Sequence, residues 1–132
     1  MRYLGIDYGS RYVGLALGDD ETRMAMPYKT IDQTWADLFA ILKEVVASEG
    51  IESVVVGMPE NVGSSTEQEE ATRVFITTLA DRIDTPVYAQ NERYTSKQSQ
   101  QHRKEGSTAD EHSIAAMLIL QGYLDSLPST EH

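Results

Sequence analysis

A single carboxylate, Asp7, stands at the end of a short apolar segment and at the start of a glycine-containing turn. The segment Arg2–Ile6 is predicted to be a strand, and a second apolar segment leaves the turn at Tyr12. Aspartate has poor strand propensity, and a buried charge is costly unless it is paired or bound to a metal. Gly9 lets the backbone turn tightly or lets a ligand approach. Asp7 is therefore the cap of a hairpin turn, a metal ligand, or part of a phosphate-binding loop.

Length and composition are those of one globular domain. The chain has 132 residues, 40% of them hydrophobic, which is close to the commonest domain size. It contains no cysteine, so disulfides and thiolate metal sites are excluded. No apolar segment approaches the roughly 18 residues of a membrane span, and no signal-peptide pattern is present. We expect one domain over residues 1–127, a loose tail over 128–132, no membrane association and a cytoplasmic location.

The charge balance is strongly acidic but uneven along the chain. The formal net charge is −10, from 21 acidic and 11 basic residues, which argues against tight nonspecific binding of nucleic acid. Four basic residues nevertheless gather in one segment, namely Arg93, Lys97, Arg103 and Lys104. They indicate either a locally basic surface or a solvated helix face.

The N-terminal elements that must position Asp7 are strands. Three closely spaced apolar segments predict an antiparallel meander, and they are Arg2–Ile6, Tyr12–Leu17 and Met24–Lys29. Helical periodicity follows, because six apolar residues share one helical face: Trp35, Leu38, Phe39, Leu42, Val45 and Val46. Thr34 and Asp37 form a capping-box pattern at its start, and Gly50 ends it.

The C-terminal half alternates between strands and helices. The β-branched segment Ser53–Gly57 predicts a buried parallel strand, a helix is expected over about Glu67–Arg82, and a fifth strand begins at Pro86. Thr95 is placed to cap a short polar helix, and the last helix has a predicted inner stripe of Ile114, Met117, Leu118, Gln121 and Leu124. This order predicts a mixed five-stranded α/β sheet with helices on both faces.

Four motifs, in order and at matching spacing over essentially the whole chain, resemble the YqgF/RuvX family. They are Gly5-Ile6-Asp7-Tyr8-Gly9-Ser10 with Gly14, Val55-Val56-Gly57-Met58-Pro59, Glu92-Arg93-Tyr94-Thr95-Ser96, and the segment from Ala115 to Leu124. The resemblance implies a ribonuclease H-like fold. Members are described as nucleases that process the 5′ end of precursor 16S ribosomal RNA, or as Holliday junction resolvases.

The resemblance also implies a metal site. On this fold, carboxylates hold Mg²⁺ or Mn²⁺ for phosphodiester hydrolysis. Asp7 matches the family's first-strand acid, and Glu92 matches the acid after the fifth strand, with Asn91 before it. The alternative for Glu92 is a salt bridge to Arg93 or Lys97.

The third acid is where this sequence departs from the family. Members carry an aspartate three residues before the first alanine of the last motif, and that position is His112. His112 is a candidate ligand or general base, because imidazole binds Mn²⁺ and accepts protons. Asp110 is a second candidate, and a missing third ligand is the remaining possibility. The alternative roles are a helix-start histidine for His112 and a helix cap for Asp110.

The resemblance assigns substrate contacts less directly. Arg93 is expected to contact a phosphate, with Lys97 in the same basic segment. Thr95 is a phosphate donor or a helix cap, and Asn61 stands where the family has a polar residue. Tyr8 is a candidate for stacking on a base.

Three other functions remain open from the sequence. Branched DNA is an alternative substrate to precursor ribosomal RNA, and junction cleavage would favour a homodimer. A nucleic-acid or ribosome-associated adaptor without activity is a second possibility. The turn after Asp7 also fits a phosphate-loop ATP-binding domain, although 132 residues supply only one of the two domains that such enzymes need.

Overall fold

The computed structural model describes residues 1–59, 67–91 and 109–128 of the chain, with the side chains of 109 and 110 left out. The elements run in the order β1 (Arg2–Tyr8), β2 (Tyr12–Asp19), β3 (Met24–Asp32), α1 (Leu38–Ser48), β4 (Ser53–Met58), α2 (Glu67–Arg82), β5 (Val87–Asn91) and α4 (Ala109–Ser126). The predicted short helix capped by Thr95 lies outside the described residues.

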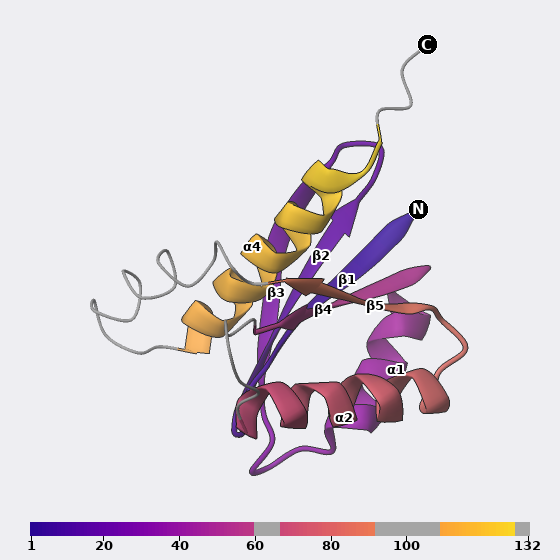
Figure 1. Ribbon diagram of the computed structural model, residues 1–132. Helices are drawn as coiled ribbons and strands as arrows, with labels where there is room; N and C mark the ends of the chain where they lie inside the picture. Colours follow the sequence, from indigo (N-terminus) through magenta and orange to yellow (C-terminus); the bar gives the residue numbers. More distant parts are fainter. Residues whose placement is uncertain (60–66, 92–108, 129–132) are drawn as a thin grey trace.

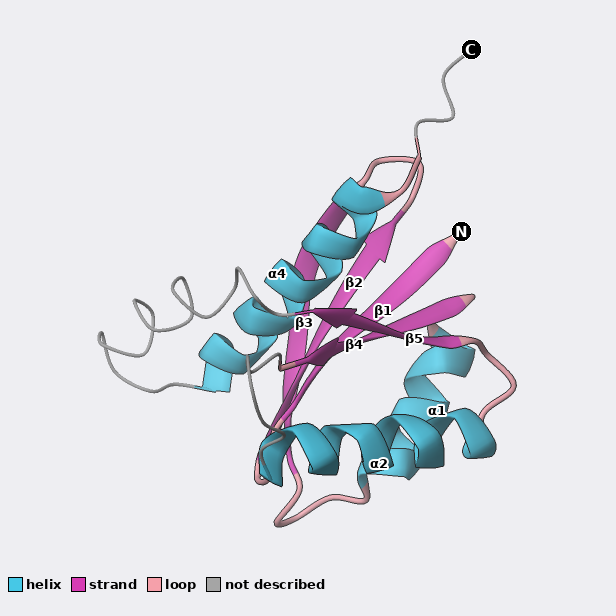
Figure 2. Cartoon of the chain, viewed as in Figure 1, coloured by secondary structure: helices cyan, strands magenta, loops and turns pink. Residues whose placement is uncertain are grey.

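The strands form one five-stranded sheet in the order β3-β2-β1-β4-β5. Strands β1, β2 and β3 are antiparallel neighbours, while β4 is parallel to β1 and β5 is parallel to β4. Helix α4 covers one face of the sheet, and α1 and α2 cover the other (Figures 1 and 2). The predicted fold class, a mixed sheet of ribonuclease H-like topology between helices, is confirmed. In the part of the chain that the structure describes, no helix is long and apolar enough to cross a membrane.

Strand alternation assigns each residue of β1 to one of the two faces. Leu4 and Ile6 lie in the core beneath α1 and α2. Tyr3 lies in the second core, beneath α4, and Gly5 faces the α4 residue Leu120. The next residue of this series is Asp7, so the alternation assigns its side chain to the α4 face.

Glycines on the sheet let α4 approach closely. A Cβ atom at Gly5 would lie 2.7 Å from Cβ of Leu120, and one at Gly14 would lie 1.8 Å from the carbonyl oxygen of His112. Neither distance is compatible with a side chain, so the backbone of α4 rests directly on the strands. The opening motif therefore carries glycines partly because α4 packs on them, in addition to the turn at Gly9.

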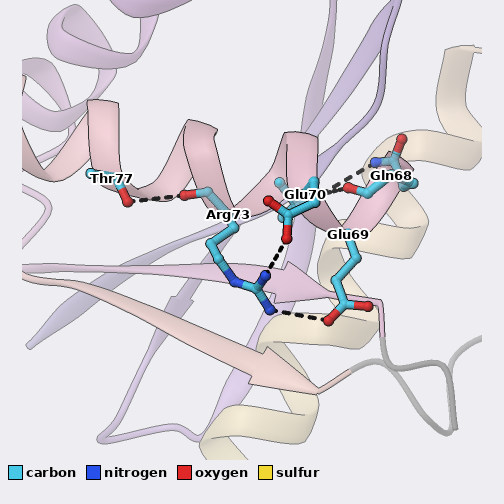
Figure 3. A network of polar contacts seen from close by, with 6 residues as sticks. Gln68, Glu69, Glu70, Arg73 and Thr77 are labelled. Carbon is cyan, nitrogen blue, oxygen red and sulfur yellow. Dashed lines mark hydrogen bonds and ion pairs between the residues drawn. The ribbon is translucent and has the colours of Figure 1, made fainter. Parts of the chain in front are cut away.

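The other face of the sheet is covered by α1 and α2, and α2 also bonds to the end of β1. The Nε2 group of Gln68, in the first turn of α2, donates to the carbonyl oxygen of Tyr8 at 2.7 Å. Figure 3 shows Arg73 donating to Glu69 and Glu70, at 3.1 and 2.6 Å. Such exposed pairs stabilise a helix by only about 0.2–0.5 kcal/mol each. The bond to Tyr8 connects the first turn of α2 to the end of β1.

The start of α1 differs from the prediction. Asp37 is the N-cap, its carboxylate accepting from the Ala40 amide at 3.3 Å, and the helix begins at Leu38. Asp32 accepts from the Thr34 amide at 2.9 Å, and this local bond favours a turn over a helix. Trp35 therefore lies in a loop and is 84% exposed, so the prediction that it packs on the helix core is wrong.

The buried side of α4 also differs from the prediction. Of the predicted stripe, Leu124 is fully buried, whereas Gln121 is only partly buried. Besides Leu124, the second core contains Ala116, Ile119 and Leu120, which the predicted stripe left out, and the predicted Met117 is partly buried against it. Gly5 and Gly18 make room for Leu120, whose side chain packs directly on the strands.

Candidate active site

Asp7 lies at the end of β1, opposite Gly14 of β2 in the antiparallel register. Because the His112 carbonyl rests on Gly14, the first turn of α4 lies over the strand pair that carries Asp7. Figure 1 shows this end of α4 near the end of β1. The N-terminus of a helix carries a partial positive charge, so the arrangement suits anionic groups such as carboxylates and phosphates.

His112 is partly buried and contacts an aromatic ring. Its imidazole centroid is 5.1 Å from that of Tyr12, with an angle of 32° between the planes. Tyr12 and Gly14 lie on the same face of β2 by strand alternation. The structure thus brings His112 to the end of the sheet that carries Asp7.

Glu111 is a residue that the sequence analysis left out of the candidate site. Its Oε1 atom is buried at the start of α4. The sequence signal was present but ambiguous, because a glutamate three residues after Thr108 also fits a capping box. Glu111 is therefore an acidic candidate beside His112 on the first turn of α4. The side chain of Asp110 lies outside the described residues.

One predicted contact lies away from Asp7. The ring of Tyr8 stacks on Phe75 of α2, with centroids 4.3 Å apart and planes 14° apart. Neighbouring residues of a strand point to opposite faces, so Tyr8 belongs to the α1 and α2 side. Tyr8 therefore lies on the side opposite Asp7 with its ring against Phe75, and its stacking on a base stays a prediction.

The remaining predicted site residues lie outside the described residues: Asn61, Glu92, Arg93, Thr95 and Lys97. Glu92 directly follows Asn91, the last residue of β5. Two residues before it, Gln90 faces α4, where its Nε2 atom is 3.4 Å from a Cβ built at Gly122. The roles of these five residues stay predictions.

The turn after Asp7 is tightly built. A Cβ atom at Gly9 would lie 2.6 Å from the Tyr12 carbonyl oxygen, so the tight turn alone accounts for glycine at this position. Gln33 donates to the Gly9 carbonyl at 2.7 Å. The turn thus connects β1 to β2 in a hairpin, and it begins directly after the strand end that bears Asp7.

Arg11 is a positively charged side chain on the turn between β1 and β2. It pairs with Asp32 at 3.4 Å and lies 4.9 Å from the centroid of the Tyr12 ring. The Thr34 amide, together with Arg11, holds the pKa of Asp32 below its usual range. The sequence analysis did not include Arg11 or Tyr12 in the candidate site. Strand alternation places Tyr12 on the same face as Gly14, and this pattern could have identified Tyr12.

The types of ligand atom at this end of the sheet suit a hard divalent cation. Carboxylate oxygens are the ligands that Mg²⁺ and Mn²⁺ prefer, and both Asp7 and Glu111 supply them. Among the side chains that the structure describes, no three acidic or histidine groups gather closely enough to hold a metal ion. A metal site with three such ligands would need a residue beyond that part of the chain, and Glu92 stays the predicted one.

The sheet order and the carboxylate at the end of β1 define a ribonuclease H-like α/β protein. Residues 1–126 match the family described as RuvX, Holliday junction resolvase. The chain belongs to the RuvX family, as the four sequence motifs implied.

Curated relatives match over nearly their full length. Proteins named "Putative pre-16S rRNA nuclease" are 38% identical in Moorella thermoacetica, covering 96% of both chains, and 33% identical in Maridesulfovibrio salexigens, covering 94% of this chain and 98% of the relative.

Solved structures support the same fold. Thermus thermophilus RuvC in complex with a Holliday junction substrate is similar with a TM-score of 0.60 and 18% identity over 94% of both chains. The Fowlpox virus resolvase in complex with Holliday junction DNA has a TM-score of 0.63 and 14% identity over 98% of this chain and all of the other.

Proposed function

We propose that this protein is a divalent-metal-dependent nuclease that hydrolyses phosphodiester bonds. The observation that carries the proposal is the position of Asp7, a carboxylate at the end of β1 beneath the first turn of α4. Membership of the RuvX family supports a nuclease over the ATP-binding and adaptor alternatives. The cytoplasm stays the expected location.

The proposed metal ligands are Asp7, Glu92 and a third residue at the start of α4. His112 is our first choice for the third ligand, with Asp110 as the alternative. When bound, Mg²⁺ or Mn²⁺ would activate the attacking water and stabilise the leaving oxygen. The N-terminal end of α4 favours negative charge at this position, so it would help to hold the substrate phosphate beside Asp7.

Precursor 16S ribosomal RNA, processed at its 5′ end, is the substrate we propose first. The names of the relatives in Moorella thermoacetica and Maridesulfovibrio salexigens support it. Arg93, Lys97, Thr95 and Asn61 are the proposed contacts to the RNA backbone.

Cleavage of Holliday junctions is the second candidate function. The description of the family favours it. Because a junction resolvase must cut two strands, this activity would favour a symmetric homodimer that presents two sites.

A cleavage assay with both substrates tests the proposal. The protein is incubated with a precursor 16S 5′ fragment and with a four-way DNA junction, in Mg²⁺, in Mn²⁺ and with a chelator. We expect metal-dependent cleavage of the RNA, abolished by the chelator. Preferential cleavage of the junction would instead select the resolvase function, and no cleavage of either substrate at saturating metal would contradict the proposal.

A further inference from the structure

An exposed tryptophan lies near the end of the sheet that carries Asp7. Trp35 is the single tryptophan of the chain and is 84% exposed. Its loop is fastened to the turn after β1, because the Gln33 amide donates to the Arg11 carbonyl at 2.8 Å and the Gln33 side chain donates to the Gly9 carbonyl at 2.7 Å. The Trp35 amide donates to the Asp32 carbonyl at 3.2 Å. The exposed indole therefore stands on a loop that hydrogen bonds hold in place.

Two further planar groups lie next to this loop, Arg11 on the turn to which the loop is fastened and Tyr12 at the start of β2. The Arg11 guanidinium lies over the Tyr12 ring, 4.9 Å from its centroid. The Arg11 side chain is 59% exposed even though it pairs with Asp32, so it is accessible to a second anionic partner. Tyr12 in turn contacts His112 at the start of α4. The exposed Arg11 guanidinium and the partly buried Tyr12 ring thus connect this turn with the start of α4.

We propose that Arg11, Tyr12 and Trp35 form a stacking surface that binds unpaired nucleotides of a single strand beside Asp7. The inference rests on the proposed nuclease function and specifies the part of the substrate that the site grips. Unpaired bases stack on aromatic side chains and on guanidinium planes, and the charge of Arg11 complements a phosphate. In a chain of net charge −10, contacts of this kind can supply affinity without a large basic surface.

The single tryptophan makes the test direct. Intrinsic fluorescence is recorded while Asp7→Asn protein is titrated with a single-stranded RNA, a DNA strand of the same sequence and the matching duplex. We expect saturable quenching by the single strands and little by the duplex. Stronger quenching by RNA than by DNA would identify RNA as the natural ligand, and equal quenching would mean that the surface reads only unpaired bases.

Substitutions test which groups make the contact. Binding of a labelled single strand, followed by anisotropy, should weaken at least about fivefold in Trp35→Ala, as expected when one stacked base is lost. Trp35→Phe should restore most of the affinity. Arg11→Gln should weaken binding and reduce its salt dependence. Val74→Ala, which removes an exposed apolar side chain from α2, serves as the matched control and should bind normally.

Several results would overturn the inference. They are single-strand binding without any change in fluorescence, equal quenching by the duplex, and a concentration-dependent shift of the emission without nucleic acid, which would mean that Trp35 contacts a second copy. Failure of the proposed function is distinguishable, because wild-type protein would then quench with single strands yet cleave nothing in Mg²⁺ or Mn²⁺.

Discussion

At the scale of single residues, the environment of Asp7 depends on the residue opposite it. Gly14 pairs with Asp7 across the β1–β2 ladder, and the His112 carbonyl occupies the space that a side chain at position 14 would need. One missing Cβ atom therefore allows α4 to bring its first turn to Asp7.

Gly14→Ala should destabilise the protein. A methyl group 1.8 Å from the His112 oxygen forces α4 away from the sheet, and overpacking of this kind costs about 1–3 kcal/mol or more. Urea unfolding measures the loss, and cleavage should fall with it. Gly122→Ala is the control, because its Cβ would have room and helix propensity favours alanine by up to about 1 kcal/mol. A wild-type unfolding midpoint for Gly14→Ala would contradict the packing described above.

The third metal ligand is also a question about single residues. We expect His112→Ala to weaken Mn²⁺ binding more than about tenfold. Removing a metal ligand should cost more metal affinity than removing a residue that only hydrogen-bonds to a ligand. Asp110→Asn should change it less than about threefold. Mn²⁺ titration followed by electron paramagnetic resonance measures both variants. The reverse order would assign the ligand to Asp110, and a large loss only in Glu111→Gln would assign it to the buried carboxylate.

At the scale of elements, α4 is fastened to the β2–β3 turn by one amide side chain. Gln121 accepts from the Ala25 amide at 2.9 Å and donates to the Arg23 carbonyl at 2.7 Å. Arg23 has a left-handed backbone, with φ of 56°, and its side chain donates to the Leu127 carbonyl at 3.0 Å. These bonds join the C-terminal part of α4 to the sheet.

Gln121→Leu should loosen this attachment. The substitution leaves an amide and a carbonyl of the turn without their partner, at a cost of about 1–3 kcal/mol. Met117→Leu, a volume-conserving change on the same helix, should cost less than about 1.5 kcal/mol. Thermal unfolding compares the two variants, and equal stability of Gln121→Leu and wild type would show that the bonds contribute nothing.

The elements themselves were largely predictable from the sequence. Apolar segments and glycine turns located the strands, and the observed α2 has the predicted bounds. Competition between local hydrogen bonds and helix formation was not predictable, so Trp35 was assigned to a buried face although the Asp32 turn exposes it. The inner stripe of α4 was predicted only in part, since Leu124 is buried as expected whereas Ile119 and Leu120 were left out.

The candidate site was predictable only in part. Asp7 could be identified because a carboxylate at a strand end needs a partner or a metal. The face on which Tyr8 lies could not be predicted, because the predicted strand ended at Ile6 whereas β1 extends to Tyr8. The contact between Arg11 and Tyr12 depends on a turn geometry that the sequence does not specify.

At the scale of the whole molecule, an acidic chain must bind an acidic polymer. If the four residues Arg93, Lys97, Arg103 and Lys104 each contact a phosphate, single-strand affinity should fall roughly 50-fold between 50 and 200 mM salt, from a slope of about −0.7 per contact. Replacing Arg103 and Lys104 with glutamine should reduce the slope by about 1.4. Anisotropy at several salt concentrations measures it, and an unchanged slope would show that the basic segment is a solvated surface.

The most direct test of the nuclease account is the Asp7→Asn substitution. Asparagine keeps the size of the side chain and removes the charge that the metal requires. Cleavage of the precursor 16S fragment in Mg²⁺ or Mn²⁺ should fall more than about 100-fold, beyond the loss caused by mutating an outer partner of a metal ligand, whereas Asp81→Asn on the exposed side of α2 should cleave normally. Equal cleavage by Asp7→Asn and Asp81→Asn, with both variants folded, would contradict the account.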